Sequence, residues 1–571
     1  MAGDLKVFGQ SVPMREGIPD WNRDPVTGRS IPLDFGLFID FRHIGGGVDI
    51  KHLWEVNRHL WWVTIAQAWA LTGRQAYLAR LGALIDDWVR ACPYGRGANW
   101  ASPVEHGIRL INWSIVWQLI GGERCDLWQG QSGRERLQRW YACIFQHMRF
   151  ASDNYSRYSS ADNHLIGEAA GVFVAGHVWD CWAQARQLRR RAKRILETET
   201  LRQFAPDGVN REQALCYHEF SLQFLLAAGL CARAAEDDFA PATWGRIEAA
   251  LTFLAAMVDG QGRLPAIGDA DDGRVWALGA SDAHRFLLAL GAALFSRDDL
   301  HAKAQAGRAQ PDAPLSWIAG VAPHVPVDAG AVRRLPTRFE QGGYVLLGHD
   351  LHDPDELRVL FDCGSLGYNR IAGHGHADAL SVLLTWAGRE WLVDAGTYCY
   401  NAAPQLRRYF RGTSAHNTLV VDDQDQSEYG ASFLWLRDVN CALIPENGAT
   451  GRRVHATHDG YLRLSDPVMH HRRVTLDGRT LLVEDWLECA QPHDVMLHWH
   501  AGVGIALQRE GADWALRADG HTVRLRLEGA EFQAGVIEGC EDPVQGWVSP
   551  RFYERAAAPV LVARARLSPR Q

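Results

Sequence analysis

The chain has 571 residues, of which 47% are hydrophobic and 22% are charged, and no low-complexity tract interrupts them. This composition is typical of a folded globular protein and excludes a disordered one. A chain of this length exceeds one ordinary hydrophobic core, so two or three domains are expected. The formal net charge of -8 offers no general attraction for nucleic acid or for an anionic membrane surface, so neither is expected as a partner.

Cysteine usage and the N-terminus indicate a compartment. The 11 cysteines are scattered without a CxxC pair, which predicts reduced thiols rather than a disulfide framework or a thiolate zinc site. Residues 1–6 lack the apolar core of a signal peptide, and no run of about 18 apolar residues occurs. We therefore expect a cytoplasmic protein, or a periplasmic or secreted one if a leader segment has been removed.

The first half of the chain predicts helices. Residues 1–50 are rich in Gly, Pro and Asp, and indicate an irregular N-terminal arm with short strands. From residue 51 apolar residues recur at helical spacing up to Thr72, where Gly73 provides a stop. Further helical segments follow near residues 74–91, 103–121, 133–150, 162–180, 183–204, 211–235, 242–259 and 283–296. Short Gly- or Pro-bearing links between them predict antiparallel helix pairs.

The second half predicts strands. Residues 310–340 are rich in Pro, Ala and Gly, and mark a boundary that divides a helical domain, 51–325, from a sheet domain, 326–571. Short apolar runs separated by turn residues follow, near residues 344–347, 357–361, 379–384, 390–393, 418–421, 475–476, 480–485 and 523–527. Many close strands without intervening helices favour an antiparallel sandwich, so the fold class is α+β.

Three polar clusters are candidates for chemistry. In the first, His374 and His376 stand two positions apart, so on an extended segment they project to one face, although a histidine near a strand end is often merely solvated. In the second, Asp162 is explained as a helix N-cap, which leaves Asn163 and His164 unexplained. The third runs from residue 211 to 219 and includes Tyr217 beside His218, which ordinary packing also explains.

Taken in order, these motifs resemble the heparinase II/III family of polysaccharide lyases from about residue 50 to beyond 480. The motifs are Asn163-His164-Leu165-Ile166-Gly167-Glu168, Glu212-Gln213 with Tyr217-His218, Gly373-His374-Gly375-His376-Ala377-Asp378, Val393-Asp394-Ala395-Gly396 and Arg411-Gly412-Thr413-Ser414-Ala415-His416-Asn417-Thr418. The resemblance implies an incomplete (α/α) toroid followed by a multi-layer antiparallel β-sandwich. It also implies β-elimination at a uronic acid of an acidic polysaccharide or oligosaccharide.

The resemblance also implies catalytic roles. Asn163 and His164 would bind and neutralise the uronate carboxylate, because its developing charge must be taken up before C5 can lose a proton. Tyr217 would be the general acid, and on some sugar epimers also the base. His374 would be the base or would stabilise the carboxylate, and Tyr409 matches a further active-site tyrosine of some relatives.

Substrate contacts are expected from charged and aromatic side chains. Arg408 and Arg411 would supply local positive charge that the acidic chain otherwise lacks, with Glu212 nearby in the tyrosine motif. Most tryptophans of the helical half are expected in the core. Trp100 is the candidate to line a groove, where its ring would stack on a sugar.

A structural zinc ion is a further expectation from the resemblance. Its ligands would be His376, Asp394 and a third histidine, for which His458 is favoured over its rival His416. Imidazole and carboxylate groups suit zinc. The two neighbouring histidines would then divide their roles, with His374 facing the substrate and His376 the metal.

Two other functions remain open. A glycoside hydrolase needs two carboxylates flanking the scissile bond, and candidates are Asp207, Asp269, Asp271 and Asp272, although Asp-rich Gly loops are more often turns. A protein that binds a uronate polymer without cleaving it is the other alternative. Heparan sulfate-like chains, other glycosaminoglycans, alginate and a bacterial exopolysaccharide are the candidate polymers.

Overall fold

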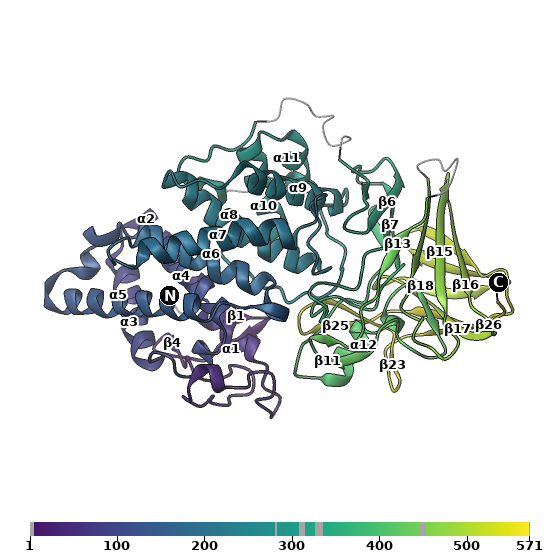
Figure 1. Cartoon of the computed structure of the whole chain (residues 1–571), viewed down its shortest axis with the longest axis horizontal. Coiled ribbons are helices and arrows are strands. Elements are labelled where there is room, and N and C mark those ends of the chain that lie inside the picture. The colour runs from purple at the N-terminus through teal and green to yellow at the C-terminus, as the bar shows by residue number, and fades with distance from the viewer. Residues whose placement is uncertain (1–4, 280–281, 308–313, 326–334, 446–451, 570–571) are drawn as a thin grey trace. The chain divides into compact units, whose positions relative to one another are not determined.

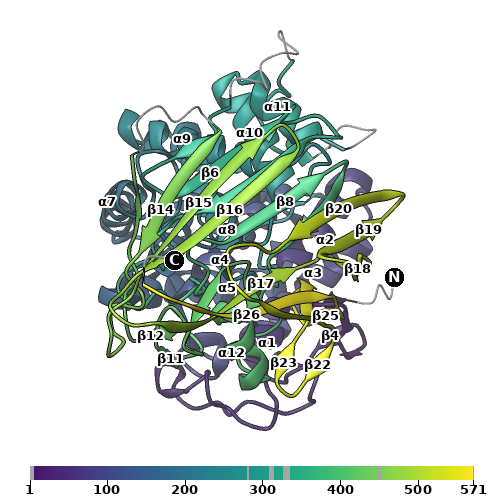
Figure 2. The same ribbon diagram turned by 90° about the vertical axis from the view of Figure 1, so that its right-hand side faces the viewer.

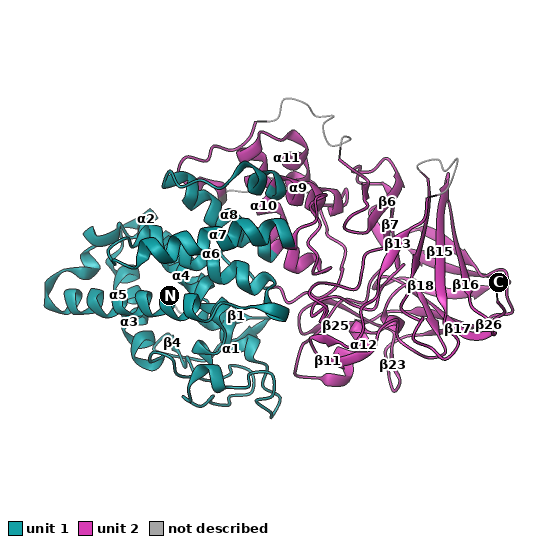
Figure 3. Ribbon diagram, in the orientation of Figure 1, with its two compact units in different colours: residues 1–202, 220–247, 273–281 teal, residues 203–219, 248–272, 282–571 magenta. Residues whose placement is uncertain are grey.

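The computed structural model of the chain describes residues 5–279, 282–307, 314–325, 335–445 and 452–569 (Figure 1). It divides into two compact units (Figure 3). Unit 1 comprises residues 1–202, 220–247 and 273–281, and unit 2 comprises residues 203–219, 248–272 and 282–571. Unit 2 therefore contains three segments of the helical half, the last of which carries α10 and α11, besides the sheet region. The predicted domain boundary after residue 325 falls at the edge of residues 326–334, which lie outside the described residues, and it stays a prediction.

The N-terminal arm is irregular, as predicted, with two short hairpins. Strand β1 (Lys6–Val7) pairs with β2 (Gln10–Ser11), and β3 (Met14–Arg15) pairs with β4 (Ile18–Pro19). The helices that follow are α1 (Ile50–Asn57), α2 (Leu60–Thr72), α3 (Gln75–Ala91), α4 (Pro103–Leu119), α5 (Gly130–Asp153), α6 (Asn163–Val178), α7 (Ala185–Gln203), α8 (Leu215–Ala234), α9 (Pro241–Met257), α10 (Ala283–Phe295) and α11 (Asp298–Gln305).

The first predicted helix is in fact two. His59 has a left-handed backbone, with φ of 62°, and separates α1 from α2. Its ring is buried, stacks on Trp62 at 3.7 Å between centroids, and its Nδ1 accepts a hydrogen bond of 2.9 Å from Trp113 Nε1. These tertiary contacts override the continuous helical pattern of residues 51–72. The predicted stop at Gly73 is confirmed, with φ of 63°.

Helix α6, which begins with the motif residue Asn163, packs closely against α4. A Cβ atom on Gly107 of α4 would lie 2.2 Å from the carbonyl oxygen of Gly167 on α6, so only glycine permits this approach. At the N-terminus of α6 the Asp162 carboxylate accepts the His164 amide at 3.0 Å. The predicted N-cap is therefore confirmed.

Helix α8 (Leu215–Ala234) is long and strongly apolar. It is the one helix among the described residues that is long and apolar enough to cross a membrane, and 78% of its most apolar window is buried inside the structure. A core helix has the same properties.

The sheet region of unit 2, from residue 338 onward, consists mainly of antiparallel sheets (Figure 2). Strands β5 (Arg338–Phe339), β6 (Tyr344–His349), β7 (Leu357–Asp362), β8 (Val382–Trp386) and β9 (Arg389–Leu392) form one sheet in sequence order. A second sheet contains β13 (Cys441–Leu443), β14 (Arg453–His458), β15 (Met469–Asp477) and β16 (Thr480–Glu488). A third has the order β10 (Leu419–Val421), β17 (His493–His500), β26 (Val560–Leu567) and β21 (Gln533–Ile537), and a fourth contains β18 (Ala506–Glu510), β19 (Asp513–Ala518) and β20 (His521–Arg526).

Three pairs of short strands, two to five residues long, complete the region. They join β11 (Tyr429–Ala431) to β12 (Leu434–Trp435), β22 (Cys540–Glu541) to β23 (Val544–Gln545) and β24 (Trp547–Arg551) to β25 (Glu554–Ala557). One buried cluster draws side chains from all four larger sheets, including Phe361, Val474, Trp514 and Leu561. Such shared burial between layers is what a sandwich requires, and the predicted α+β class is confirmed.

The sequence missed one helix in this region. Helix α12 (Pro404–Arg411) begins with Pro404 in its first turn. Proline there is favoured because its missing N–H has no intrahelical partner in any case. Pro404 was therefore the one sequence feature that indicated the start of a helix in this strand-rich region.

Candidate active site

Tyr217 lies in the first turn of α8 and points at a histidine from the sheet region. Its ring stacks on that of His374 with 3.6 Å between centroids and 18° between planes. Its hydroxyl lies 2.9 Å from that of Tyr400 and donates to Asp271 Oδ2 at 3.3 Å. Burial and the neighbouring Asp271 carboxylate raise the pKa of Tyr217 well above its ordinary value. The phenol is therefore protonated at neutral pH and available as an acid.

His374 is oriented by a carboxylate. It lies in the loop between β7 and β8, and its Nδ1 is 3.0 Å from Asp269 Oδ2. The backbone fixes the same pair, because the Asp269 amide donates to the His374 carbonyl at 2.9 Å. A carboxylate on Nδ1 holds the proton there and leaves Nε2 as the acceptor. The Nε2 atom lies 4.0 Å from Glu212 Oε2, so Glu212 is a neighbour of the proposed base.

Asp269 is the centre of a buried charge network. Besides His374, its carboxylate contacts His376 Nε2 at 2.9 Å and forms a two-point ion pair with Arg407, one contact of which is 2.7 Å. Burial opposes the charge, but Arg407 and the two histidines hold the pKa of Asp269 well below its ordinary value. Asp269 is thus a permanent anion, which suits an orienting group and does not suit the general acid of a hydrolase.

A glycine allows Asp269 to reach this position. Gly268 has φ of 59°, and a Cβ atom there would lie 2.3 Å from the carbonyl oxygen of Gln213. The segment that carries Asp269 therefore passes directly against the residues that precede α8. This contact brings the carboxylate to the tyrosine motif.

Arg407 and Tyr400 complete the arrangement. Arg407 lies on α12, is fully buried, and its Nε and Nη2 atoms donate to the Ser432 carbonyl at 3.0 and 2.7 Å. Its guanidinium lies 4.9 Å from the centroid of the Tyr400 ring, a distance at which a cation interacts favourably with an aromatic face. Burial and the nearby Tyr217 hydroxyl raise the pKa of Tyr400 well above its ordinary value, so it too remains protonated.

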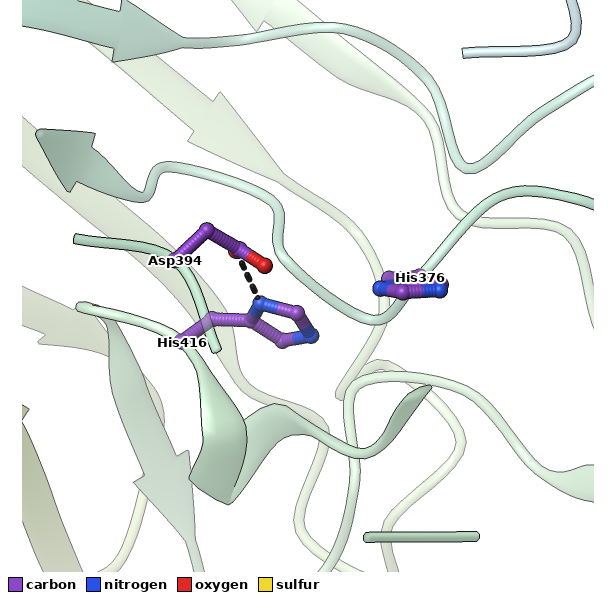
Figure 4. Close-up of side chains that lie close together, drawn as sticks. All are labelled: His376, Asp394 and His416. Carbon is purple, nitrogen blue, oxygen red and sulfur yellow. Dashed lines mark hydrogen bonds and ion pairs between the residues drawn. The ribbon is translucent and has the colours of Figure 1, made fainter. Parts of the chain in front are cut away.

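A potential metal centre adjoins the same loop (Figure 4). His376, Asp394 and His416 are buried and each offers a ligand atom within 4.8 Å of the others. His416 Nδ1 lies 2.5 Å from Asp394 Oδ2, while Asp394 Oδ1 accepts the Gly396 amide at 2.8 Å. Within the described residues, His376 Nδ1 and His416 Nε2 are buried ring nitrogens without a hydrogen-bond partner. Two orphaned imidazole nitrogens beside a carboxylate fit the donor set that zinc prefers.

Comparison with known proteins gives the family. One family model, the heparinase II/III N-terminus, matches residues 8–281, and a second, the heparinase II/III-like C-terminal region, matches residues 331–568. The chain belongs to the heparinase II/III family. It is therefore a polysaccharide lyase, as the sequence motifs predicted. A comparison with curated proteins finds no match.

Solved structures of this family share the fold. A heparinase III structure has a TM-score of 0.71 at 15% identity, over 93% of this chain and 77% of that one. The heparan sulfate lyase HepC from Pedobacter heparinus has a TM-score of 0.61 at 17% identity, over 94% and 77% of the two chains. The likeness confirms the predicted fold class, an incomplete (α/α) toroid followed by a multi-layer antiparallel β-sandwich.

Among the site residues expected of a heparinase II/III enzyme, the third metal ligand differs from the favoured choice. The structure places His416 beside Asp394, and it places His458 elsewhere. His458 Nε2 lies 3.0 Å from His470 Nδ1, and its own Nδ1 accepts the Gly460 amide at 3.1 Å. With both ring nitrogens engaged in this way, His458 belongs to a separate histidine pair, and the rival His416 takes its place in the cluster.

The arginines expected to bind substrate separate into two groups. Arg411 is fully buried, and its guanidinium donates to the carbonyls of Ala372, Gly373 and Gly375 at 3.1 to 3.3 Å. It holds the histidine loop in shape and offers no face to a sugar, so its assignment as a substrate ligand was wrong. Arg408 is exposed on α12 and remains a candidate.

Two aromatic assignments also change. Tyr409 packs in a buried cluster with Ala395, Phe410 and Ala415, and the tyrosine whose hydroxyl meets that of Tyr217 is Tyr400. Trp100 is 0% exposed, and its ring packs on His106 and His147 at 4.8 and 4.5 Å. It is a core residue in this structure and presents no surface for stacking on a sugar.

Asn163 and His164 belong to unit 1, at the first positions of α6. Asn163 is buried and His164 is partly exposed. Behind them, Glu168 accepts the Ser156 amide at 2.7 Å and the Ser156 hydroxyl at 2.6 Å, which ties the preceding loop to the helix. Their predicted role at the substrate carboxylate stays a prediction.

The remaining carboxylates of the hydrolase alternative have structural duties. Asp207 Oδ2 accepts the amides of Gln341 and Gly342 at 2.8 and 2.9 Å, and Asp272 Oδ2 accepts that of Phe552 at 3.2 Å. Sequence reasoning considered Asp269 and Asp271 only as hydrolase candidates, and it missed Tyr400 altogether. The Asp-rich stretch at residues 269–272 was the available signal for the first two.

Proposed function

We propose that this lyase cleaves a uronic-acid-containing polysaccharide or oligosaccharide by β-elimination. His374 Nε2 takes the C5 proton, the electrons of the C5–H bond form the C4–C5 double bond, and the C4–O4 bond breaks. Tyr217 gives its proton to the departing O4. The products are a new hydroxyl on one fragment and an unsaturated uronate on the other.

One observation carries the proposal, which is the contact between Tyr217 and His374. A protonated phenol and an imidazole with a free Nε2 lie face to face at 3.6 Å between ring centroids, so an acid and a base are available at one place. Asp269 fixes the tautomer of the base, as the third member does in other catalytic triads. Tyr400, 2.9 Å from the Tyr217 hydroxyl, would return a hydrogen bond to the phenolate that forms after proton transfer.

Charge on the substrate carboxylate must also be stabilised. Asn163 and His164 are the groups proposed for this step on the strength of the family motif, and Arg408 is proposed as a substrate contact. Donors that meet the developing charge are commonly worth 10² to 10³ in rate, about 3 to 4 kcal/mol.

A zinc ion is proposed at His376, Asp394 and His416. When bound, it would supply positive charge that fixes the side chains of these three residues and the loop that carries His374. His376 would engage the metal through Nδ1, because its Nε2 is already engaged with Asp269 at 2.9 Å. The proposed role of the zinc ion is structural, and the zinc ion takes no part in the proton transfers.

The substrate class is proposed to be heparan sulfate or a chemically similar glycosaminoglycan, since the structural relatives include a heparan sulfate lyase. Purified protein would be mixed with heparan sulfate, other glycosaminoglycans, alginate and a bacterial exopolysaccharide. The ultraviolet absorbance of the unsaturated product would be followed. A rise with one polymer and none with the Tyr217→Phe variant supports the proposal, whereas new reducing ends without absorbance would indicate hydrolysis.

A further inference from the structure

A second group of metal-ligand side chains lies in unit 2 and shares no residue with the site described above. It consists of Asp466, Cys489 and His493, whose ligand atoms all lie within 4.8 Å of one another. Asp466 lies in the loop between β14 and β15, Cys489 directly follows β16, and His493 is the first residue of β17. The β14–β15 loop and the two ends of the β16–β17 turn therefore converge on one point.

The histidine of this group is already oriented as in a metal centre. His493 Nδ1 lies 2.7 Å from Asp422 Oδ2, and its Nε2 lies 3.0 Å from Asp466 Oδ2. Asp422 is itself held, because its Oδ1 accepts the Asp494 amide at 3.1 Å. Metal-binding histidines usually donate their second N–H to a carboxylate in this way, which fixes the ring and raises its basicity.

The aspartate is positioned by the same turn that carries the cysteine. Asp466 Oδ2 accepts the amides of Ala490 and Gln491 at 3.1 and 2.7 Å. Among the described residues all hydrogen bonds to this carboxylate go to Oδ2, so Oδ1 retains its lone pairs for a cation. The turn thus holds Cys489 and Asp466 together without using up the carboxylate.

The spacing suits zinc. Ligand atoms about 2.0 to 2.3 Å from a tetrahedral zinc ion lie roughly 3.3 to 3.8 Å apart, which falls inside the 4.8 Å that contains the ligand atoms of this group. A thiolate, an imidazole and a carboxylate form a donor set that favours zinc over magnesium or calcium, which prefer oxygen alone.

We propose that Asp466, Cys489 and His493 bind one zinc ion, with Asp422 orienting His493 and water as the fourth ligand. Coordination replaces the Cys489 S–H bond by a sulfur–zinc bond, and the proton is released to solvent. The ion would cross-link the β14–β15 loop and the β16–β17 turn.

Cysteine spacing gave no sign of this site. The sequence contains no CxxC pair, and the three ligands are separated by 23 and 4 positions in the chain. The group becomes visible only in the folded chain, where the β14–β15 loop lies against the turn between β16 and β17.

The test uses the full chain, stripped of metal and titrated with Co²⁺ in place of zinc. Cobalt bound to a thiolate gives a charge-transfer band in the near ultraviolet. The group of His376, Asp394 and His416 has no sulfur, so it cannot give this band, and the cysteine variants below identify which thiolate does. We expect the intensity of the band to reach the value for one cobalt–thiolate bond per chain as Co²⁺ is added. The band should disappear when Zn²⁺ displaces the Co²⁺.

Variants make the assignment specific. Cys489→Ser, a near-isosteric change, should abolish the band, and Asp422→Asn should weaken cobalt binding by about 10-fold to 100-fold. Cys540→Ser, at another partly exposed cysteine in a hairpin, and His416→Ala should leave the band unchanged. Circular dichroism would verify the fold of each variant. A native protein without the band, or a band that persists in Cys489→Ser, would overturn the proposal.

Discussion

The ring of His374 stacks on the ring of Tyr217, with 3.6 Å between centroids. The two residues come from parts of the chain 157 positions apart, one at the start of a helix and the other in a loop between strands. Both belong to unit 2. The acid and the base of the proposed elimination are therefore held within one compact body, whereas Asn163 and His164 belong to the other.

The first prediction concerns the Tyr217 hydroxyl. Tyr217→Phe retains the stacked ring but removes the proton donor, so turnover on the best polymer of the panel should fall about 10²-fold or more. The thermal unfolding midpoint should change little, because the ring contacts persist. Initial rates from product absorbance and a thermal melt check both expectations.

The second prediction separates two neighbouring tyrosines. Tyr400→Phe should lower turnover, by less than Tyr217→Phe does, because Tyr400 supports the phenol without donating to the substrate. Tyr409→Phe is the matched control, since the Tyr409 ring packs among Ala395, Phe410 and Ala415. If Tyr409→Phe were the more damaging change, the assignment of Tyr400 would be incorrect.

The third prediction concerns the buried pair of Asp269 and Arg407. Removing one partner leaves the other as an uncompensated buried charge, so Asp269→Asn or Arg407→Met should each lower the free energy of unfolding by about 3 to 5 kcal/mol. The double variant should lose less than the sum of the two single losses, which denaturant unfolding would measure. Additive losses would show that the ion pair is not coupled.

Much of the fold was predictable, because the apolar periodicity changes once along the chain. The helical repeat before residue 300 and the short alternating runs after residue 340 predict helices and then sheets, as observed. His59 shows the limit of this approach. Its stacking on Trp62 and its bond from Trp113 are tertiary contacts, and they break a helix whose local pattern is continuous.

Site residues that stand within one short sequence motif could be predicted. Site residues that come together only through folding of distant segments could not. Tyr217, His374, His376 and Asp394 each stand in a recognisable motif. Asp269 was taken for a turn residue or a hydrolase carboxylate, because only folding brings His374, His376 and Arg407 around it. Arg411 shows the reverse error, since a charged residue near the motif turned out to bind loop carbonyls.

The fourth prediction decides the third metal ligand. His416→Ala should lower the zinc content of the purified protein by one equivalent and lower its thermal midpoint, because His416 lies beside Asp394 at 2.5 Å. His458→Ala is the control and should retain the zinc, since His458 pairs with His470. Elemental analysis of both variants gives the answer, and the opposite pattern would restore His458 as the ligand.

The last prediction is a pH dependence of stability that arises from Glu168. Burial raises the pKa of Glu168 from 4.5 to about 8, although its hydrogen bonds from Ser156 oppose the rise. The folded chain thus keeps a proton that the unfolded chain releases between these two pH values. Stability contributed by this group is complete below pH 4.5 and is lost as pH rises to about 8.

Glu168→Gln removes this titration while keeping an oxygen that accepts from Ser156. Its thermal midpoint, measured against that of the native chain, should improve steadily as pH is raised from 5 to 8. Glu135→Gln, on the exposed face of α5, should show a constant difference across the same range. A Glu168→Gln difference that does not vary with pH would mean that Glu168 is already ionised at pH 5 in the folded chain, with Ser156 outweighing the effect of burial.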